Sequence, residues 1–370
     1  MMRSAFLIGM TMLVASPATA QQGGTLVSAE PQLGATNGMQ VWRIRYWTTS
    51  DRGQPQQVTG MVVAPRGPRP QYPRKVIAWT HGTWGTAEQC APSQSPRFFE
   101  LTPALDSVRN GYVVVAPDFP GLGSPGPHPY LVGTVTARST IDAVRAAQQI
   151  QGAFAGRRYA VWGESQGGHA ALWTGQLAGV ESGGLELVGV AAGAPPTNLA
   201  ENFRQASDPN AKALLTSLAA TSWSRYYNVP LMIGRRTTPA IMNRFAGNCV
   251  SVESGPKLGA LLGILTLRRD LKQVDFAATP PWSSYVAANS TAPFQRVPVL
   301  IAQTRDDPLV AAPVTRRFAR RLCQNRVRVR WLDLPGKDHA TTARQSADET
   351  LRWIEDRFQG LRAPTNCGQI

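Results

Sequence analysis

The sequence predicts an α/β fold in which helices flank a mostly parallel central sheet, with a mostly helical segment inserted before the last two strands. Short β-branched runs alternate with helical patterns along the first half of the chain, which indicates right-handed crossovers between parallel strands. This alternation stops between about 197 and 291, where no strong strand pattern appears. It resumes at Val297 with a strand pattern, a helix and another strand pattern.

The N-terminus has the pattern of a cleavable secretory signal. A basic start at Met1-Met2-Arg3 precedes a short apolar run, and Ala18-Thr19-Ala20 supplies small residues at a cleavage site. The apolar run is too short to span a bilayer, although a retained anchor is the alternative. We expect export to the periplasm or the medium, with cleavage near Ala20.

Composition and cysteine content agree with an exported globular protein. A hydrophobic content of 43% is sufficient for a large core. The four cysteines favour two disulfides, and four cysteines permit three pairings. Because no Cys-x-x-Cys spacing occurs, the cysteines do not predict a zinc site.

The formal charge of +15 comes almost entirely from arginine. The arginines are scattered, and no stripe of basic and aromatic residues accompanies them. We therefore predict a solvated basic surface and no nucleic-acid partner. Transient attraction to an anionic lipid interface is a secondary possibility.

The first half of the chain supplies the strands that place the candidate site. Residues 21–36 are glycine-rich and predict a loose lead-in. The expected strands are 41–48, 57–63, 75–80, 112–116, 158–162 and 186–192, and the expected helices are 98–108 and 136–149. His81, Asp118 and Ser165 each follow a strand, at the carboxyl edge where parallel sheets place their sites.

The second half contains the insertion and the return to the sheet. Helical patches at 211–219 and 258–271 predict a helical cap, and the leucines of the second patch form a stripe typical of a core: Leu258, Leu261, Leu262 and Leu265. Strands are expected at 297–303 and 327–334, and helices at 313–321 and 342–358. The predicted division is a signal at 1–20, a first core part at 21–196, the cap at 197–291 and a second core part at 292–370.

The strongest motif is Gly163-Glu164-Ser165-Gln166-Gly167, which contains Gly-x-Ser-x-Gly. It follows a strand pattern and opens an alanine-rich helix, the context of a nucleophile elbow. Small neighbours permit the sharp turn, and the helix N-terminus directs N–H groups toward charge that forms when the serine attacks a carbonyl. A glycine-rich turn without chemistry is the alternative interpretation.

A nucleophilic serine needs a base, and the chain has four histidines. His81 and His128 precede the serine, and His169 lies one turn along its helix, where it cannot reach the hydroxyl. His339 follows the last predicted strand, so it alone satisfies the order serine, acid, histidine.

The acid should follow the preceding strand. Asp306 and Asp307 are adjacent there, and Val310, three residues after Asp307, favours Asp307 as the acid. Asp306 is the second choice and Asp333 the third. The acid would hold the imidazole tautomer and stabilise the imidazolium.

An oxyanion hole needs two N–H donors. We expect one from Gln166 and the other from the loop after the strand 75–80, at Thr83 or, as second choice, Trp84. His81-Gly82 is otherwise only a tight turn. The side chains of Glu164 and Gln166 either adjust the site or cap the helix.

These residues resemble the α/β-hydrolase superfamily and, more narrowly, the secretory lipase family of the lipase A type. The resemblance rests on His81-Gly82-Thr83, Cys90-Ala91-Pro92-Ser93, Asp118 to Gly123, Gly163 to Gly168, and Asp307 with Val310. It implies hydrolysis of carboxylic esters by a secreted enzyme whose cap forms an acyl tunnel or lid. It also implies disulfides Cys90–Cys249 and Cys323–Cys367. Fungal members carry an acidic residue near the oxyanion loop where this chain has Thr83, so their acyl specificity is not carried over.

The expected substrate is a small-molecule or lipid ester. A serine peptidase or an acyltransferase would use the same machinery, because fold and triad do not fix the leaving group. A non-catalytic binding protein on the same scaffold is the alternative from another class. No cofactor is predicted, since the chain has neither Gly-x-Gly-x-x-Gly after a strand nor His-Glu-x-x-His.

Overall fold

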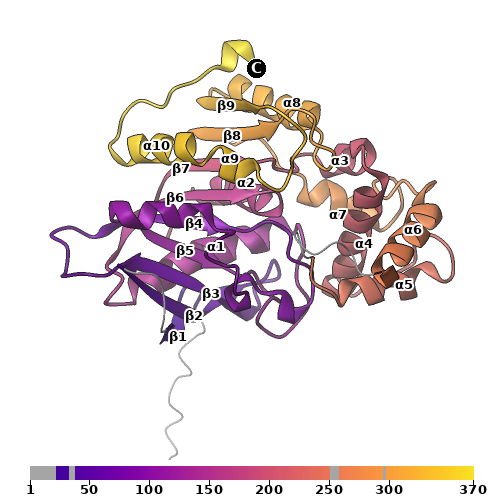
Figure 1. The fold of residues 1–370 in the computed structure, drawn as a ribbon, viewed down its shortest axis with the longest axis horizontal. Helices are drawn as coiled ribbons and strands as arrows, with labels where there is room; N and C mark the ends of the chain where they lie inside the picture. Colours follow the sequence, from indigo (N-terminus) through magenta and orange to yellow (C-terminus); the bar gives the residue numbers. More distant parts are fainter. Residues whose placement is uncertain (1–21, 33–37, 251–257, 295–296) are drawn as a thin grey trace, which may run out of the picture.

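One large sheet organises the described part of the chain, which in this computed structural model comprises residues 22–32, 38–250, 258–294 and 297–370. Its strands are β1 (Leu26–Pro31), β2 (Met39–Thr49), β3 (Pro55–Pro65), β4 (Arg74–Thr80), β5 (Val113–Pro117), β6 (Ala155–Glu164), β7 (Glu186–Gly193), β8 (Val299–Thr304) and β9 (Val329–Leu334). They lie in the order β1-β2-β3-β5-β4-β6-β7-β8-β9 (Figure 1). The pairs β1–β2, β2–β3 and β3–β5 are antiparallel. All neighbouring pairs from β5 onward in this order are parallel. The mostly parallel sheet expected from the sequence is confirmed.

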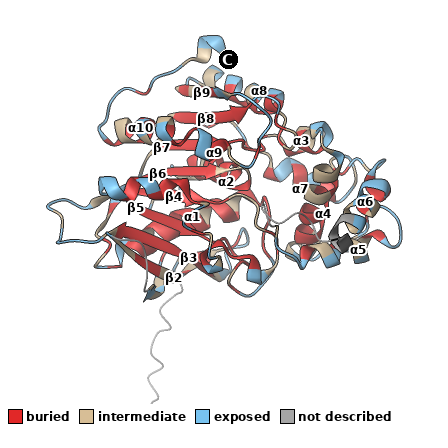
Figure 2. Ribbon diagram, viewed as in Figure 1, coloured by how far each residue is buried: buried red, intermediate tan, exposed pale blue. Residues whose placement is uncertain are grey.

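Helices cover both faces of the sheet, so the β-branched central strands are buried on both sides. One face packs against α1 (Gly133–Gln148), α2 (Gln166–Leu177) and α8 (Ala312–Gln324). The other packs against the 3₁₀ helix η3 (Pro103–Asn110), α9 (Thr342–Gln345) and α10 (Ala347–Phe358). Figure 2 shows the central strands largely buried between these layers, whereas the edge strand β1 has no buried residue. Shorter 3₁₀ turns are η1 (Glu88–Cys90), η2 (Pro92–Gln94) and η4 (Cys367–Gln369).

A helical segment separates β7 from β8, inside the predicted range 197–291. Its described helices are α3 (Leu199–Gln205), α4 (Pro209–Tyr226), α5 (Thr238–Ala246), α6 (Leu258–Leu271) and α7 (Trp282–Asn289). They gather at one side of the sheet (Figure 1) around a core of their own that includes Trp223, Phe276 and Trp282.

The expected core stripe of α6 is wrong where the structure describes it. Leu262 and Leu265 are 58% and 44% exposed, whereas Leu267 and Leu271 are buried. α6 packs against α4 and α5 with the face that carries Leu267 and Leu271, which leaves Leu262 and Leu265 on the solvent side. The side chains of Leu258 and Leu261 lie outside the described residues.

Three local predictions differ from the structure. The lead-in contains the edge strand β1, which pairs with β2 and shows no clean alternation of its own; residues 21 and 33–36 lie outside the described residues. The helix expected at 98–108 is instead η3, which begins at Pro103, because Pro103 has no N–H and Thr102 before it is outside the helical region (φ −117°, ψ 82°). The last helix is divided at Ser346, whose hydroxyl bonds back to Thr342 O.

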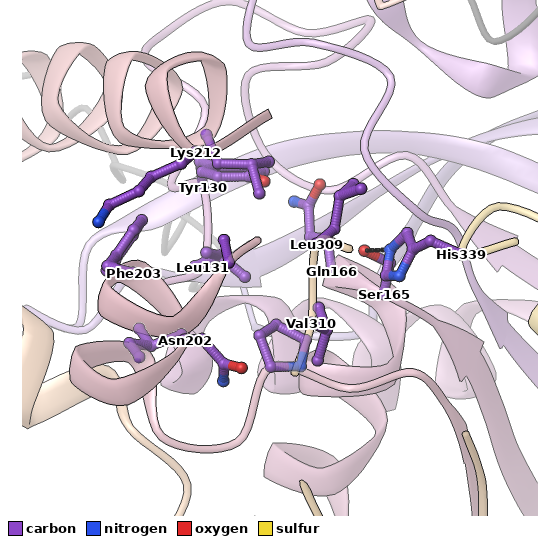
Figure 3. Close-up of a pocket in the computed structure, with 14 residues that line it drawn as sticks. Tyr130, Leu131, Ser165, Gln166, Asn202, Phe203, Lys212, Leu309, Val310 and His339 are labelled. Carbon is purple, nitrogen blue, oxygen red and sulfur yellow. Dashed lines mark hydrogen bonds between the residues drawn. The ribbon is translucent and has the colours of Figure 1, made fainter. Parts of the chain in front are cut away.

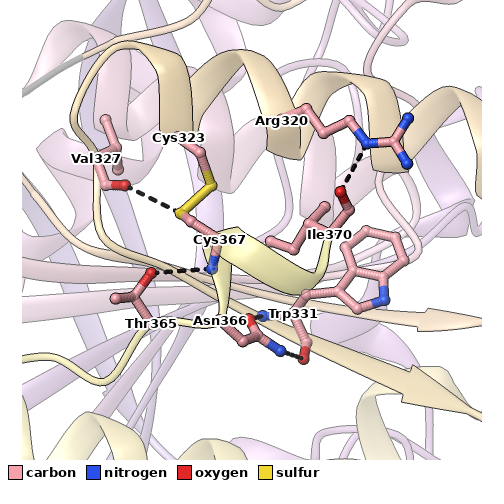
Figure 4. The surroundings of a disulfide bond; sticks show 8 residues. All are labelled: Arg320, Cys323, Val327, Trp331, Thr365, Asn366, Cys367 and Ile370. Carbon is pink, nitrogen blue, oxygen red and sulfur yellow. Dashed lines mark hydrogen bonds between the residues drawn. A yellow bond between two sulfur atoms is a disulfide. The ribbon is translucent and has the colours of Figure 1, made fainter.

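Two disulfides join distant parts of the chain, and both implied pairings are confirmed. Cys90–Cys249 links the loop after β4 to the helical insertion. Cys323–Cys367 links α8 to the C-terminal tail, where Arg320 also contacts the Ile370 carbonyl oxygen (Figure 4). Across the described residues no helix has the length and apolar character needed to span a bilayer.

We expect the Cys90→Ala/Cys249→Ala double variant to lower the free energy of unfolding by about 2–5 kcal/mol. The cross-link closes a loop with a sequence separation of 159, so it removes more unfolded-state entropy than Cys323–Cys367, with a separation of 44. Urea unfolding of this variant and of Cys323→Ala/Cys367→Ala measures both losses. Equal stability of wild type and the first variant would contradict the prediction.

Candidate active site

Ser165 occupies a strained turn between β6 and α2. Its backbone is at φ 53° and ψ −117°, a conformation that non-glycine residues rarely adopt. A Cβ built on Gly163 or Gly167 would overlap Thr80 at the end of β4, so only glycine lets the turn pack there. The turn raises the serine hydroxyl above the N-terminus of α2.

The structure brings together the three residues chosen as nucleophile, base and acid, which follow β6, β9 and β8. His339 Nε2 lies 2.8 Å from Ser165 Oγ (Figure 3), and His339 Nδ1 lies 2.7 Å from Asp307 Oδ2. Because an ionised carboxylate only accepts hydrogen bonds, Nδ1 carries the proton and Nε2 accepts from the serine. This is the proton arrangement that a general base needs before it deprotonates a serine.

Four hydrogen bonds fix the Asp307 carboxylate. Oδ1 accepts from the backbone N–H groups of Leu309 and Val310, each at 2.9 Å. Oδ2 accepts from His339 and from Gln303 Nε2 at 3.1 Å. Gln303 was not predicted from the sequence. The available signal was an amide after four apolar residues of the strand, since a buried amide needs partners.

The second and third choices for the acid lie elsewhere. Asp306 is exposed, and Asp333 pairs with Arg305 at 3.1 Å. Within the described ranges neither aspartate hydrogen-bonds to His339. The remaining histidines contact other groups: His81 the carbonyl oxygens of Gly82 and Asp118, His128 that of Pro120, and His169 that of Asn289.

Asp118 also lies apart from this triad, although it ends a neighbouring strand. Its buried carboxylate accepts from Ser93 N and Ser93 Oγ, at 2.8 and 2.6 Å, and from Thr59 Oγ1 at 2.7 Å. It therefore fixes the loop that carries Cys90, and gives that loop a structural link to β3.

Opposing effects set the pKa of His339. Burial lowers it, but the hydrogen bond and charge of Asp307, followed by the charges of Glu164 and Asp338, raise it above its ordinary value. A general base works in its neutral form. Activity that depends on His339 should therefore fall as pH drops through this raised pKa.

Glu164 couples the elbow to the loop that follows His339. Its Oε1 accepts a hydrogen bond from Ala343 N at 2.8 Å. Burial raises the pKa of Glu164 to about 7. The hydrogen bond from Ala343 and the charge of His339 lower this pKa but do not offset the effect of burial. The Glu164 carboxyl therefore holds the segment that follows His339 and, when ionised, raises the pKa of the His339 imidazole.

Glu164→Gln should move the acidic limb of the kcat/KM profile to lower pH. Glutamine keeps an oxygen for Ala343 N–H but removes the negative charge that Glu164 carries above its pKa of about 7, and that charge raises the pKa of His339. The neutral imidazole then persists to lower pH. The pH dependence of kcat/KM for p-nitrophenyl butyrate measures the shift.

Glu186→Gln is the matched control for that profile. It makes the same change in net charge at the opposite end of the sheet, where Glu186 begins β7 and pairs with Arg158. Its profile should coincide with that of the wild type. A shift of the same size in both variants would assign the effect to net charge instead of to Glu164.

The segments that carry the two expected oxyanion donors both approach Ser165. Gln166 begins α2, and a Cβ built on Gly82, the residue before Thr83, would lie 3.9 Å from Ser165 Cβ. In the part of the chain described, the backbone N–H groups of Gln166 and Thr83 donate no hydrogen bond. Thr83 Oγ1 lies 2.9 Å from the hydroxyl of Tyr130, a contact that holds the loop.

A pocket with an empty volume of about 480 Å³, open solvent at its mouth included, begins at Ser165 and His339 (Figure 3). The loop before α1 and the helices α3 and α4 supply most of its wall, and Leu309 and Val310 complete it near the triad. Its apolar lining is Leu131, Pro196, Leu199, Phe203, Ala206, Leu215, Leu309 and Val310.

Comparisons with known proteins identify the family of this chain. The family model described as secretory lipase matches residues 98–366. Lipase A of Moesziomyces aphidis is 23% identical over 362 residues, which cover 91% of this chain and 76% of that protein. A probable inactive lipase of Mycobacterium tuberculosis is 24% identical over 340 residues, which cover 86% and 73%.

Solved structures show the same fold. Lipase A of Candida antarctica superposes with a TM-score of 0.74 at 17% identity, covering 94% of this chain and 85% of that one. A mutant of the rice cell wall degrading esterase LipA of Xanthomonas oryzae gives 0.71 at 22% identity, covering 91% and 98%. Identities this low establish a shared architecture, and the chemistry rests on the residues.

Proposed function

Because this chain belongs to the secretory lipase family and is a carboxylic ester hydrolase, we propose that Ser165, His339 and Asp307 form its catalytic triad. The observation that carries the proposal is the continuous pair of hydrogen bonds from Ser165 Oγ through His339 to Asp307. The hydrogen bonds connect nucleophile to base and base to acid, as in serine hydrolases. Mutual contact of three residues from the ends of three different strands favours chemistry over a packing role.

The reaction proceeds in two steps through an acyl-enzyme. Ser165 Oγ attacks the ester carbonyl carbon while His339 Nε2 takes its proton. His339 then gives the proton to the departing alcohol oxygen, and the C–O bond of the ester breaks. In the second step His339 takes a proton from water, whose oxygen attacks the acyl carbon, and Ser165 leaves with the proton returned.

The oxyanion of each tetrahedral intermediate accepts from the N–H groups of Gln166 and Thr83 in this proposal. Their unpaired N–H groups beside Ser165 support it, as does the position of Gln166 at a helix N-terminus. Loss of one such donor costs about 3 kcal/mol of transition-state stabilisation. Trp84 remains the second choice for the loop donor.

The helical insertion acts as a cap in this proposal. Helices α3 and α4 line the pocket at Ser165, and the Cys90–Cys249 disulfide ties the insertion to the sheet. The mainly apolar lining suits the acyl group of a lipid or small-molecule ester. Family and disulfides favour secretion, and we propose cleavage of the leader near Ala20, which lies outside the described residues.

A series of p-nitrophenyl esters from acetate to palmitate tests the function, with Ser165→Ala as the reference protein. Wild type should release p-nitrophenol far faster than the variant. The acyl length at which kcat/KM is greatest distinguishes an esterase from a lipase. Equal rates for wild type and variant on every ester would refute hydrolysis. They would favour a non-catalytic binding protein on the same scaffold, and one relative is named a probable inactive lipase.

A further inference from the structure

The apolar wall of the pocket contains one buried amide. Helix α3 presents Leu199, Asn202 and Phe203 to the pocket, spaced as one helical face, and Ala206 follows at its C-cap. Asn202 is 6% exposed, and neither Nδ2 nor Oδ1 has a hydrogen-bond partner within the described chain. Buried polar side chains almost always have partners, so an unpaired amide in a binding pocket points to a ligand group that pairs with it.

A second unpaired acceptor lies beside the nucleophile. His128 Nδ1 lies 2.9 Å from Pro120 O, so Nδ1 carries a proton, and burial lowers the pKa of His128 to about 3 and keeps the ring neutral. Nε2 is therefore an acceptor, and Gln166 Nε2 donates to it at 2.9 Å. This fixes the orientation of the Gln166 amide and leaves its buried Oε1 without a partner among the described residues.

The position of these amides relative to His339 assigns them to the acyl side. His339 protonates the departing alcohol, so the alcohol must lie beside His339. Figure 3 shows His339 at one end of the pocket, with Asn202, Leu131 and Phe203 lying away from it, beyond Ser165. The part of an ester that reaches Asn202 is consequently its acyl chain.

We propose that the acyl group of the substrate carries a hydroxyl group that pairs with Asn202, so that the pocket selects hydroxyacyl esters over hydrocarbon acyl esters of equal length. The proposal rests on the ester hydrolysis proposed above. A hydroxyl both donates and accepts, so it suits an amide in either orientation of its oxygen and nitrogen. Gln166 Oε1 offers a further acceptor nearer the ester carbonyl.

Charge and hydrogen bonding argue against other polar acyl groups. A carboxylate would need a cation in the pocket, but Lys212 lines it with its stem, and its ammonium group donates to Arg204 O at 3.4 Å on an exposed surface. Figure 3 shows that ammonium group directed away from Ser165. A ketone would pair with Nδ2 only and would leave Oδ1 unsatisfied.

Matched ethyl esters test the proposal: hexanoate, 3-hydroxyhexanoate and 6-hydroxyhexanoate, with acid release followed by titration at constant pH. Wild type should show a higher kcat/KM for at least one hydroxylated ester than for the hexanoate. In Asn202→Leu this ratio should fall by roughly 10- to 100-fold, the loss expected for one hydrogen bond to a buried group. Asn210→Leu, the same change on α4 outside the pocket lining, should keep the wild-type ratio.

An unchanged ratio in Asn202→Leu would overturn the proposal, because the amide would then pair with water only. A wild type that prefers the hexanoate over both hydroxylated esters would also overturn it. Asn202→Ala gives the same comparison if the leucine variant does not fold.

Hydrolysis of ethyl hexanoate by wild type and not by Ser165→Ala would uphold the triad whatever the ratio. If wild type cleaves no ester, calorimetric binding of 3-hydroxyhexanoate and hexanoate to wild type and Asn202→Leu still decides between the two acyl classes.

Discussion

Ser165→Ala should lower kcat on p-nitrophenyl butyrate by roughly 10⁴- to 10⁶-fold, the loss expected when a triad nucleophile is removed. Alanine cannot form the acyl-enzyme, so only the oxyanion donors and substrate binding remain to accelerate attack by water. KM should change little, because the pocket wall beyond the serine stays intact. Stopped-flow release of p-nitrophenol should show a burst in wild type if deacylation limits turnover, and none in the variant.

The variant should fold as the wild type does, since Ser165 Oγ contacts His339 and supports no helix end. Equal unfolding midpoints for the two proteins check this. Ser182→Ala, in the turn between α2 and β7 at the far end of the sheet, is the matched control and should keep full activity. Activity of Ser165→Ala within tenfold of wild type would contradict the proposed nucleophile.

The sequence predicted the elements whose patterns are local. The predicted strand 112–116 differs from β5 by only one residue at each end. It was predictable because a continuous β-branched run favours a strand covered on both faces. The strand β1 was missed because its pairing with β2, and not its own pattern, makes it a strand. The exposure of Leu262 was missed for a similar reason, since only the position of α6 at the edge of the insertion determines which of its faces is covered.

The same distinction explains what was predictable in the site. Ser165, Asp307 and His339 follow strands of one parallel sheet, and topology alone places such residues at one edge. Gln303 supports Asp307 from within β8, and Asn202 lies on a short helix without a motif. The roles of Gln303 and Asn202 depend on their surroundings in the folded protein: Gln303 contacts Asp307, and Asn202 lines the pocket. Spacing along the chain does not encode such tertiary contacts.

Asp307→Asn should lower kcat/KM by roughly 10⁴-fold while leaving the fold intact. Asparagine keeps an oxygen that can accept from the N–H groups of Leu309 and Val310, so the loop retains its geometry. Its amide nitrogen would face His339 Nδ1 as a donor and favour the tautomer with the proton on Nε2, which cannot accept from Ser165. Loss of the negative charge would also remove a cause of the raised pKa of His339, so residual activity should persist to lower pH than in wild type.

Asp306→Asn decides between the two adjacent aspartates. It makes the same chemical change one residue earlier, on an exposed side chain that does not contact His339 within the described ranges. Its kcat/KM should remain within about threefold of wild type, as expected for an exposed charge away from the reacting atoms. If Asp306→Asn instead lost the 10⁴-fold and Asp307→Asn kept its activity, Asp306 would be the acid, and the hydrogen bond from His339 to Asp307 would not be the one that orients the base in catalysis.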